Sequence, residues 1–238
     1  MKNIIIISLL IILFSSCKQD KKEQVKTAAA ASLELNETKQ DSLIVSKIDS
    51  TQFPNSIKYE GFIKNAVRWK DHLGDNIVIT TETGYYVSKK FKHEFDDSSD
   101  AALFAYHFII ADNQAKQVWK VYDFINDCPV DITASFVKNT FKITDLNKNG
   151  IAEVWLMYKT VCHGDVSPSD MKIIMYEGNQ KYAIRGENKV EVGLNDNGEK
   201  QFLGGEYKLD ENFKKAPKFF KDYALNLWNT NLIENWDN

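Results

Sequence analysis

From residue 59 onward, the chain alternates short apolar runs with clusters of turn residues. The runs are rich in β-branched and aromatic residues, and the clusters contain Gly, Asn and Asp. This pattern is typical of β-strands joined by tight turns, and it favours antiparallel sheets. It predicts strands at residues 61–69, 76–87, 103–111, 117–124, 134–144, 152–161, 172–176, 182–185 and 200–207.

The segment after Pro217 follows a different period. Its apolar residues recur at the spacing of one helix face, which predicts an amphipathic helix. We interpret its aromatic side chains as core packing rather than as a stack for a ligand. The residues on this face are Phe219, Phe220, Tyr223, Ala224, Leu227 and Trp228.

Residues 89–100 and 159–170 resemble each other weakly. Each segment contains Lys and His, and each ends in Ser-Asp. The repeat favours two blade-like sheets of about four strands, and two blades cannot close a propeller, which needs at least about four. The predicted fold is therefore mainly β and antiparallel, with two sheets packed together and a C-terminal amphipathic helix. Chance similarity between two β-meanders is the alternative interpretation.

The N-terminus has the layout of an export signal. One lysine, Lys2, precedes an apolar run at residues 4–14, and Ser15 and Ser16 lead to Cys17. The run is too short to cross a hydrocarbon core, which takes roughly 20 helical residues. The segment resembles a lipobox with Phe14 where Leu is usual, which implies that residues 1–16 are cleaved and Cys17 is lipidated. An ordinary signal or a buried cysteine is the alternative.

Residues 17–56 are polar and read as a lipidated flexible tether, which leaves residues 57–238 as a single β-rich domain with its C-terminal helix. The charged run at residues 18–23 resembles the export tag of surface-exposed lipoproteins of the Bacteroidota. The expected location is therefore the outer membrane, with the domain at the cell surface or on the periplasmic face. The membrane contact would be the lipid on Cys17.

The charge and the cysteine content limit which partners and which cellular compartment are expected. The formal net charge is -3, with no basic stripe, so no electrostatic footprint for nucleic acid is present. Without Cys17, the remaining cysteines are Cys128 and Cys162. An even pair in an exported protein favours one disulfide, while two reduced buried thiols remain the alternative.

The sharpest local motif is the loop at residues 145–153. Its side-chain oxygens alternate along the chain, a glycine permits a sharp turn, and an acidic residue closes the loop, which is a pattern that suits a hard cation. The predicted ligands are Asp145, Asn147, Asn149, the carbonyl of Ile151 and Glu153. The loop resembles the short calcium loop of FG-GAP-type repeats, so we expect weak, structural calcium binding. A metal-free turn is the alternative.

No catalytic constellation is present in the sequence. His163, Asp165 and Ser167 lie close together along one loop, but a nucleophilic site normally assembles from separate elements. We therefore treat these three residues as a candidate binding loop and predict no catalytic residues. Exposed aromatic side chains would suit sugar stacking, although Trp69, Trp119 and Trp155 lie inside predicted strands and are assigned to the core.

Residues 141–186 resemble a family of flavobacterial lipoproteins catalogued as surface-polysaccharide-biosynthesis proteins. The resemblance rests on the loop at 144–153, on Cys162, on Asp165-Val-Ser-Pro168 and on residues 181–186. It implies a role in making or displaying lipopolysaccharide or capsule, and it supplies no reaction. The leading hypothesis is non-catalytic binding of a surface glycan or an envelope protein. A glycan-active enzyme with unidentified carboxylates and a purely structural envelope protein are the alternatives.

Overall fold

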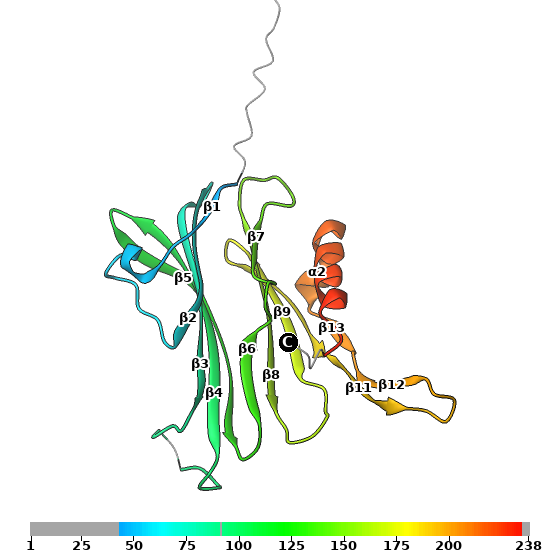
Figure 1. Ribbon diagram of the computed structural model, residues 1–238. Coiled ribbons are helices and arrows are strands. Elements are labelled where there is room, and N and C mark those ends of the chain that lie inside the picture. The colour runs from blue at the N-terminus through cyan, green and yellow to red at the C-terminus, as the bar shows by residue number, and fades with distance from the viewer. Residues whose placement is uncertain (1–42, 91, 235–238) are drawn as a thin grey trace, which may run out of the picture. The chain divides into compact units, whose positions relative to one another are not determined.

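The computed structural model describes residues 43–90 and 92–234, and this part of the chain is built mainly from antiparallel sheets (Figure 1). Neither of the two large sheets closes into a barrel, and a short helix lies near the end of the described chain. The predicted fold class is confirmed. The large sheets have more strands than the four expected in each.

The first sheet, which we call sheet A, is a meander with the strand order β1-β2-β3-β4-β5. A short 3-10 helix, η1, lies between β1 and β2. Both β1 and η1 fall within residues 17–56, so the predicted domain boundary at residue 57 is too late: β1 pairs with β2. The bounds are β1 Val45–Lys47, η1 Ser50–Gln52, β2 Phe62–Asp71, β3 Gly74–Tyr86, β4 Ser99–Ala111 and β5 Gln114–Cys128.

The second sheet, sheet B, has the order β13-β10-β9-β8-β6, and β7 also pairs with β8. A separate hairpin, β11–β12, and two helices complete the fold. The bounds are β6 Ile132–Phe136, β7 Lys142–Thr144, β8 Glu153–Cys162, β9 Asp170–Glu177, β10 Gln180–Glu187, β11 Lys189–Leu194, β12 Lys200–Gly204, β13 Tyr207–Leu209, α1 Glu211–Lys215 and α2 Lys218–Thr230.

Two predicted strands are each divided in the structure. Residues 134–144 form β6 and β7, because the turn between them is closed by hydrogen bonds from the backbone N–H and the hydroxyl of Thr140 to the Val137 carbonyl. Residues 200–207 contribute to β12 and β13, which lie in different sheets. The chain turns where β12 ends, at Gly204 and the following Gly205, with φ of 75° and 95°, a region that glycine adopts without strain.

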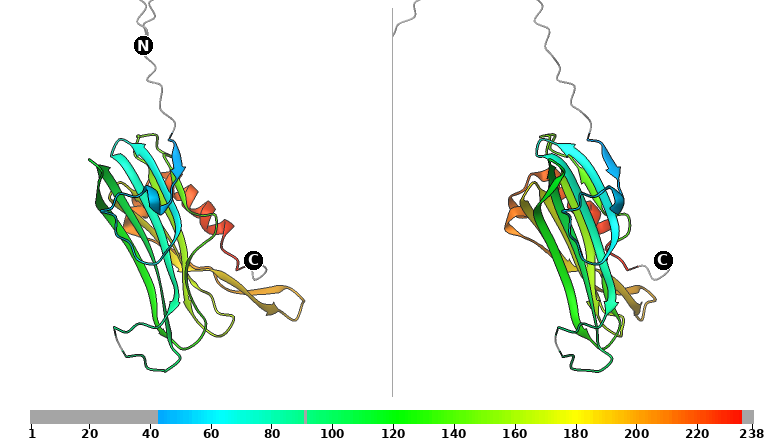
Figure 2. Two further views of the ribbon diagram at one scale, coloured as in Figure 1. Left: turned by 60° about the vertical axis from the view of Figure 1, so that its left-hand side comes forward. Right: turned by 90° about the vertical axis from the view of Figure 1, so that its left-hand side faces the viewer.

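Sheets A and B pack face to face, and α2 covers the other face of sheet B (Figure 2). The layer between the sheets combines Leu103 and Trp119 of sheet A with Leu156 and Ile174 of sheet B. Under the helices, Met157 and Ile173 of sheet B meet residues of α1 and α2. Trp69, Trp119 and Trp155 are all buried, as their positions in strands predicted.

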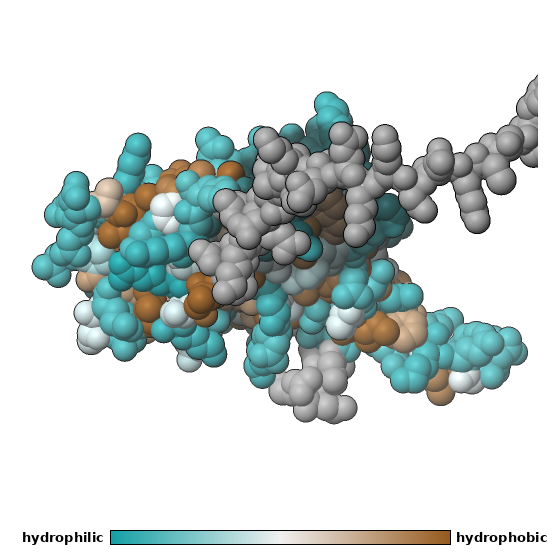
Figure 3. All heavy atoms as spheres, turned by 90° about the horizontal axis from the view of Figure 1, so that it is seen from above, coloured by the Kyte–Doolittle hydropathy of each residue, from teal (hydrophilic) through white to brown (hydrophobic). Residues whose placement is uncertain are grey.

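The predicted helix face is mostly correct. Phe220, Ala224 and Trp228 are fully buried against sheet B, and Tyr223 and Leu227 pack beside them. Phe219 is the exception, since it remains 40% exposed. Seen from above in Figure 3, exposed hydrophobic residues form separate patches among hydrophilic ones rather than one continuous apolar face.

Candidate functional site

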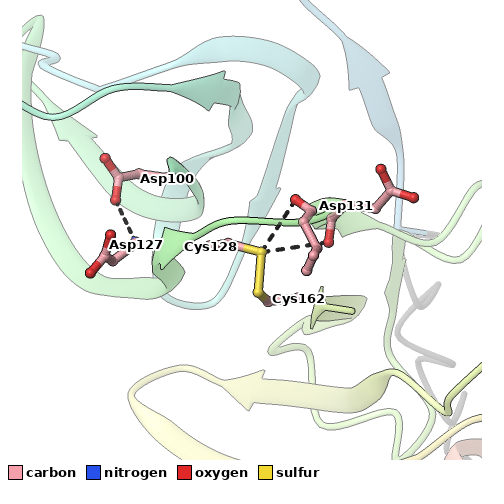
Figure 4. The surroundings of a disulfide bond; sticks show 6 residues. Asp100, Asp127, Cys128, Asp131 and Cys162 are labelled. Carbon is pink, nitrogen blue, oxygen red and sulfur yellow. Dashed lines mark hydrogen bonds between the residues drawn. A yellow bond between two sulfur atoms is a disulfide. The ribbon is translucent and has the colours of Figure 1, made fainter. Parts of the chain in front are cut away.

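The two cysteines of the domain form the predicted disulfide (Figure 4). Cys128 is the last residue of β5 and Cys162 is the last residue of β8, so the bond joins sheet A to sheet B. The Cys128 sulfur also lies 3.4 Å from the Val130 carbonyl oxygen. The predicted lipidation site Cys17 and the signal at 1–16 lie outside the described residues.

The candidate binding loop does not assemble a nucleophilic site. The Ser167 hydroxyl donates a hydrogen bond to the Asp165 carboxylate, with 2.5 Å between the oxygens, and both residues lie toward solvent. The backbone N–H of His163 donates to the Asp131 carbonyl. Within the described chain, the Nε2 atom of His163 has no hydrogen-bond partner. The geometry supplies a short exposed turn rather than a base beside a hydroxyl.

The predicted calcium loop is held by its own side chains. The Asp145 carboxylate accepts hydrogen bonds from the backbone N–H groups of Asn149 and Gly150, each at 3.1 Å. The Asn147 and Asn149 side-chain oxygens accept from backbone N–H groups two residues further along. These are the local bonds expected of a turn rich in Asp and Asn.

Two carboxylates meet beneath this loop. Glu153 is fully buried and accepts hydrogen bonds from the Thr144 hydroxyl at 2.6 Å and from the Leu146 N–H at 2.9 Å. Burial raises the pKa of Glu153, and the neighbouring charges of Asp145 and Glu177 raise it further. Glu177 lies opposite Glu153 in the β8–β9 register and accepts from the side-chain amides of Asn147 and Asn149.

A cation in this loop would have to compete with those amide hydrogen bonds. Among the described residues, no group of three or more His, Cys, Asp or Glu side chains is arranged to hold a metal ion. Oxygen donors of the right kind for calcium are nonetheless present, since Asp145, Glu153 and Glu177 surround the turn. Calcium binding here remains a prediction.

The loop also docks on the turn between β2 and β3. The His72 N–H donates to the Gly150 carbonyl at 2.8 Å, and the Ala152 N–H donates to the Asp71 carboxylate at 3.1 Å. A Cβ atom added to Gly150 would lie 2.2 Å from the His72 ring. The loop is therefore a structural connection between the two sheets.

A surface that we call the aromatic ladder lies on the face of sheet A that points away from sheet B. It consists of Tyr106, Phe104, Tyr122 and Phe124. Phe104 and Tyr122 face each other across β4 and β5, with ring centroids 4.9 Å apart, and Tyr122 and Phe124 are also 4.9 Å apart. Tyr122 is 50% exposed and Phe124 is 42% exposed, whereas Phe104 and Tyr106 are buried and support them from below.

A hollow of about 390 Å³ lies beside the ladder. Phe104 and Tyr122 form one part of its wall, and the exposed rings of Phe62 and Tyr86 form another. Polar groups of Glu60, Thr83, Ser88 and Lys90 complete the lining. Aromatic rings next to a few polar groups are typical of ligand sites in proteins.

Lys120 and Glu60 form an ion pair at the edge of the ladder. The Lys120 ammonium lies 4.8 Å from the centroid of the Phe104 ring and donates to the Glu60 carboxylate at 2.9 Å. Burial raises the pKa of the Tyr122 phenol, and the negative charge of Glu60 raises it further. Burial also raises the pKa of Tyr86, so both hydroxyls stay protonated and able to donate at neutral pH.

Comparison with protein-family models, with curated proteins and with solved structures found no match to this chain. In the described ranges, neither helix has the length and hydropathy needed to cross a bilayer.

Proposed function

We propose that this protein is a lipoprotein of the bacterial outer membrane that binds surface glycan on the aromatic ladder, without catalysing a reaction. The observation that carries the proposal is the preformed aromatic surface, in which Phe62, Tyr86 and Tyr122 border a hollow that also holds polar groups. Aromatic rings pack on the apolar faces of sugars, while hydroxyl and carboxylate groups bind sugar hydroxyls.

The rigidity of the ladder supports this role. The rings pack against one another and against Lys120, so they have little rotamer freedom to lose when a ligand binds. A soluble monomer rarely leaves several aromatic rings exposed together without a binding partner for them. Tyr122 and Phe124, the exposed rings of the ladder, therefore offer contact area at a low entropic cost.

The export signal supports the location. Lipidation of Cys17 would anchor the protein in the outer membrane, at the surface or facing the periplasm. The disulfide between Cys128 and Cys162 supports an oxidising compartment, because such bonds form and persist outside the cytosol. The resemblance to surface-polysaccharide-biosynthesis lipoproteins then points to lipopolysaccharide or capsule as the source of the glycan.

A weak structural calcium ion in the loop at residues 145–153 is part of the same proposal. It would neutralise Asp145, Glu153 and Glu177, whose negative charges lie close together. The ion would hold the loop against the turn between β2 and β3, and it would not contact the glycan.

A direct binding experiment tests the glycan proposal. The mature chain, carrying Cys17→Ser, is titrated calorimetrically with purified surface polysaccharide from the source bacterium. We expect saturable binding that weakens on the order of tenfold with Tyr122→Ala or Tyr86→Ala, because one aromatic contact contributes about 1 kcal/mol beyond area burial. Phe219→Ala is the matched control, since this ring is similarly exposed but lies on α2. Absence of binding, or equal losses in all three variants, would refute the proposal.

A further inference from the structure

A second cavity, which we call the edge groove, lies between the edges of the two sheets. It has a volume of about 690 Å³. One side is formed by residues of β1, β2 and β3, and the other by the segment from Phe136 to Ile143. Figure 1 shows β1 and β7 next to each other at this end of the sheets. The volume falls within the range of about 300–1,000 Å³ that is typical of small-molecule sites.

Part of the lining of the edge groove is apolar. Ile63 and Val67 contribute from sheet A, and Phe136, Phe141 and Ile143 contribute from the opposite side. Phe136, Phe141 and Ile143 belong to the packing between the sheets but are only partly buried. The interlayer core is therefore open to the groove at this edge, and an apolar ligand would complete it.

The charged residues that line the groove are four lysines and one glutamate. The glutamate, Glu82, is already neutralised, because its carboxylate lies 3.1 Å from the Lys64 ammonium and accepts a hydrogen bond from the Phe136 N–H at 2.7 Å. The other three lysines are Lys47, Lys138 and Lys142, and all three are exposed. The groove thus has an excess of positive charge along its margin, although the whole chain carries a formal charge of -3.

The two sides of the groove are held in place before any ligand arrives, since Lys47 lies in β1 opposite Val67 of β2 and Lys138 lies in a hydrogen-bonded turn. The Val137 N–H donates to the Met157 carbonyl at 2.9 Å, and the Thr140 hydroxyl donates to the Val137 carbonyl at 2.6 Å. Lys142 lies in β7 opposite Trp155 of β8, so its side chain starts on the face of sheet B that α2 covers and not on the face toward the groove. A ligand in the groove would therefore meet Lys47 and Lys138, which are both presented by ordered backbone.

We propose that the edge groove binds an anionic amphiphile with a single acyl chain. The chain lies on the apolar lining between Ile63 and Ile143, and the anionic head group pairs with Lys47 and Lys138. Charge complementarity decides between occupants: an uncharged chain would leave the lysines unpaired, and a free anion would leave the apolar lining exposed to water. This site is separate from the aromatic ladder, which lies on the outer face of sheet A.

Calorimetric titration of the mature chain with dodecanoate, below its micelle concentration, tests the proposal. Dodecyl maltoside supplies the same chain without charge, and acetate supplies the charge without the chain. We expect saturable binding of dodecanoate at one site, binding of the maltoside at least about tenfold weaker, and no binding of acetate. Equal binding of dodecanoate and the maltoside, or binding of acetate, would overturn the proposal.

Two sets of variants locate the site. Lys47→Glu/Lys138→Glu should weaken dodecanoate binding on the order of tenfold or more, whereas Lys208→Glu/Lys215→Glu makes the same change in net charge on exposed residues outside the groove. Equal losses of dodecanoate affinity in both variants would mean that the net charge of the protein, and not the groove, attracts the ligand, and this would refute the site. If the first variant does not fold, Lys47→Ala/Lys138→Ala takes its place. Ile143→Trp fills the groove and should abolish binding, and retained binding would also count against the proposal.

Discussion

His107 provides a prediction in which the acid sensitivity of the fold follows from one buried ring. It lies in β4, is only 2% exposed, and is flanked by Trp69 and Trp119, whose ring centroids are 5.7 Å and 5.2 Å away. Its Nε2 atom lies 2.9 Å from the side-chain oxygen of Asn76. Within the described residues, its Nδ1 atom has no hydrogen-bond partner.

The hydrogen bonds of Asn76 assign the tautomer. The Asn76 amide nitrogen donates to the Asp71 carboxylate and to the Gly74 carbonyl, so the amide oxygen faces His107 and accepts from its Nε2–H. A second proton would have to be placed on Nδ1, in surroundings that offer it no acceptor. Burial therefore lowers the pKa of His107 to about 4, despite an opposing effect of the Asp71 charge.

The sign of the effect on stability follows from proton linkage. The unfolded chain binds a proton on this histidine near its ordinary pKa of about 6.5, while the folded chain does so only near pH 4. The stability that the neutral ring contributes is thus complete above pH 6.5 and is lost progressively as the pH falls toward 4. The loss is at most about 3 kcal/mol, from about 1.4 kcal/mol per pKa unit. That is a large share of the roughly 5–15 kcal/mol typical of a domain.

Urea unfolding followed by tryptophan fluorescence, at intervals between pH 7.5 and 4.5, measures this loss. The variant His107→Gln keeps a donor for Asn76 but cannot gain a proton, so its unfolding free energy should fall less with acid than that of the native protein. His72→Gln is the control, because this histidine is exposed. Parallel pH profiles for the native protein and His107→Gln would refute the reasoning.

Three further predictions concern the disulfide, a close backbone contact and the calcium loop. Cys128→Ser/Cys162→Ser should lower the unfolding free energy by about 4 kcal/mol, from the loop of 34 residues that the bond closes; an unchanged urea midpoint would contradict this. Gly186→Ala would place a Cβ atom 1.9 Å from the Glu206 carbonyl oxygen next to β13, so it should lower the unfolding free energy, measured by thermal unfolding, by about 1–3 kcal/mol. Gly164→Ala is the control: its Cβ would lie 3.4 Å from the nearest atom, so the unfolding free energy should change little. Calcium should raise the melting temperature of the native chain but not of Asp145→Ala; an identical response in both would leave the loop as a turn only.

The strands of the two sheets could be predicted because each combines β-branched residues with clear turn signals. The aromatic ladder could not be found in the same way. Along β4, Phe104 and Tyr106 alternate with Leu103 and Ala105, so both faces of the strand are apolar and the pattern reads as one continuous buried run. Only the packing of sheet B shows that Leu103 and Ala105 point inward and that the aromatic face is the outer one.

The acidic pair beneath the calcium loop was missed for a related reason. Sequence spacing predicted Glu153 as a member of the loop, but Glu177 belongs to the far end of the next strand. The two residues become neighbours through the register of β8 and β9, in which Glu153 lies opposite Glu177. A shift of the pairing by one residue would move Glu177 to the other face of the sheet. Such a contact depends on tertiary pairing, which composition and local spacing do not determine.

The two proposed sites depend differently on the contact between the sheets. The aromatic ladder belongs to β4 and β5 of sheet A alone, so it needs only the pairing of those strands. The edge groove takes one side from each sheet, and β6 runs from Ile132, which pairs with Cys162 beside the disulfide, to Phe136 in the groove. The disulfide fixes the spacing of the sheets at one end of β6, and the bond from the Phe136 N–H to Glu82 fixes it at the other. Changes in sheet packing should therefore alter the groove before they alter the ladder, because the rings of the ladder are held within a single sheet.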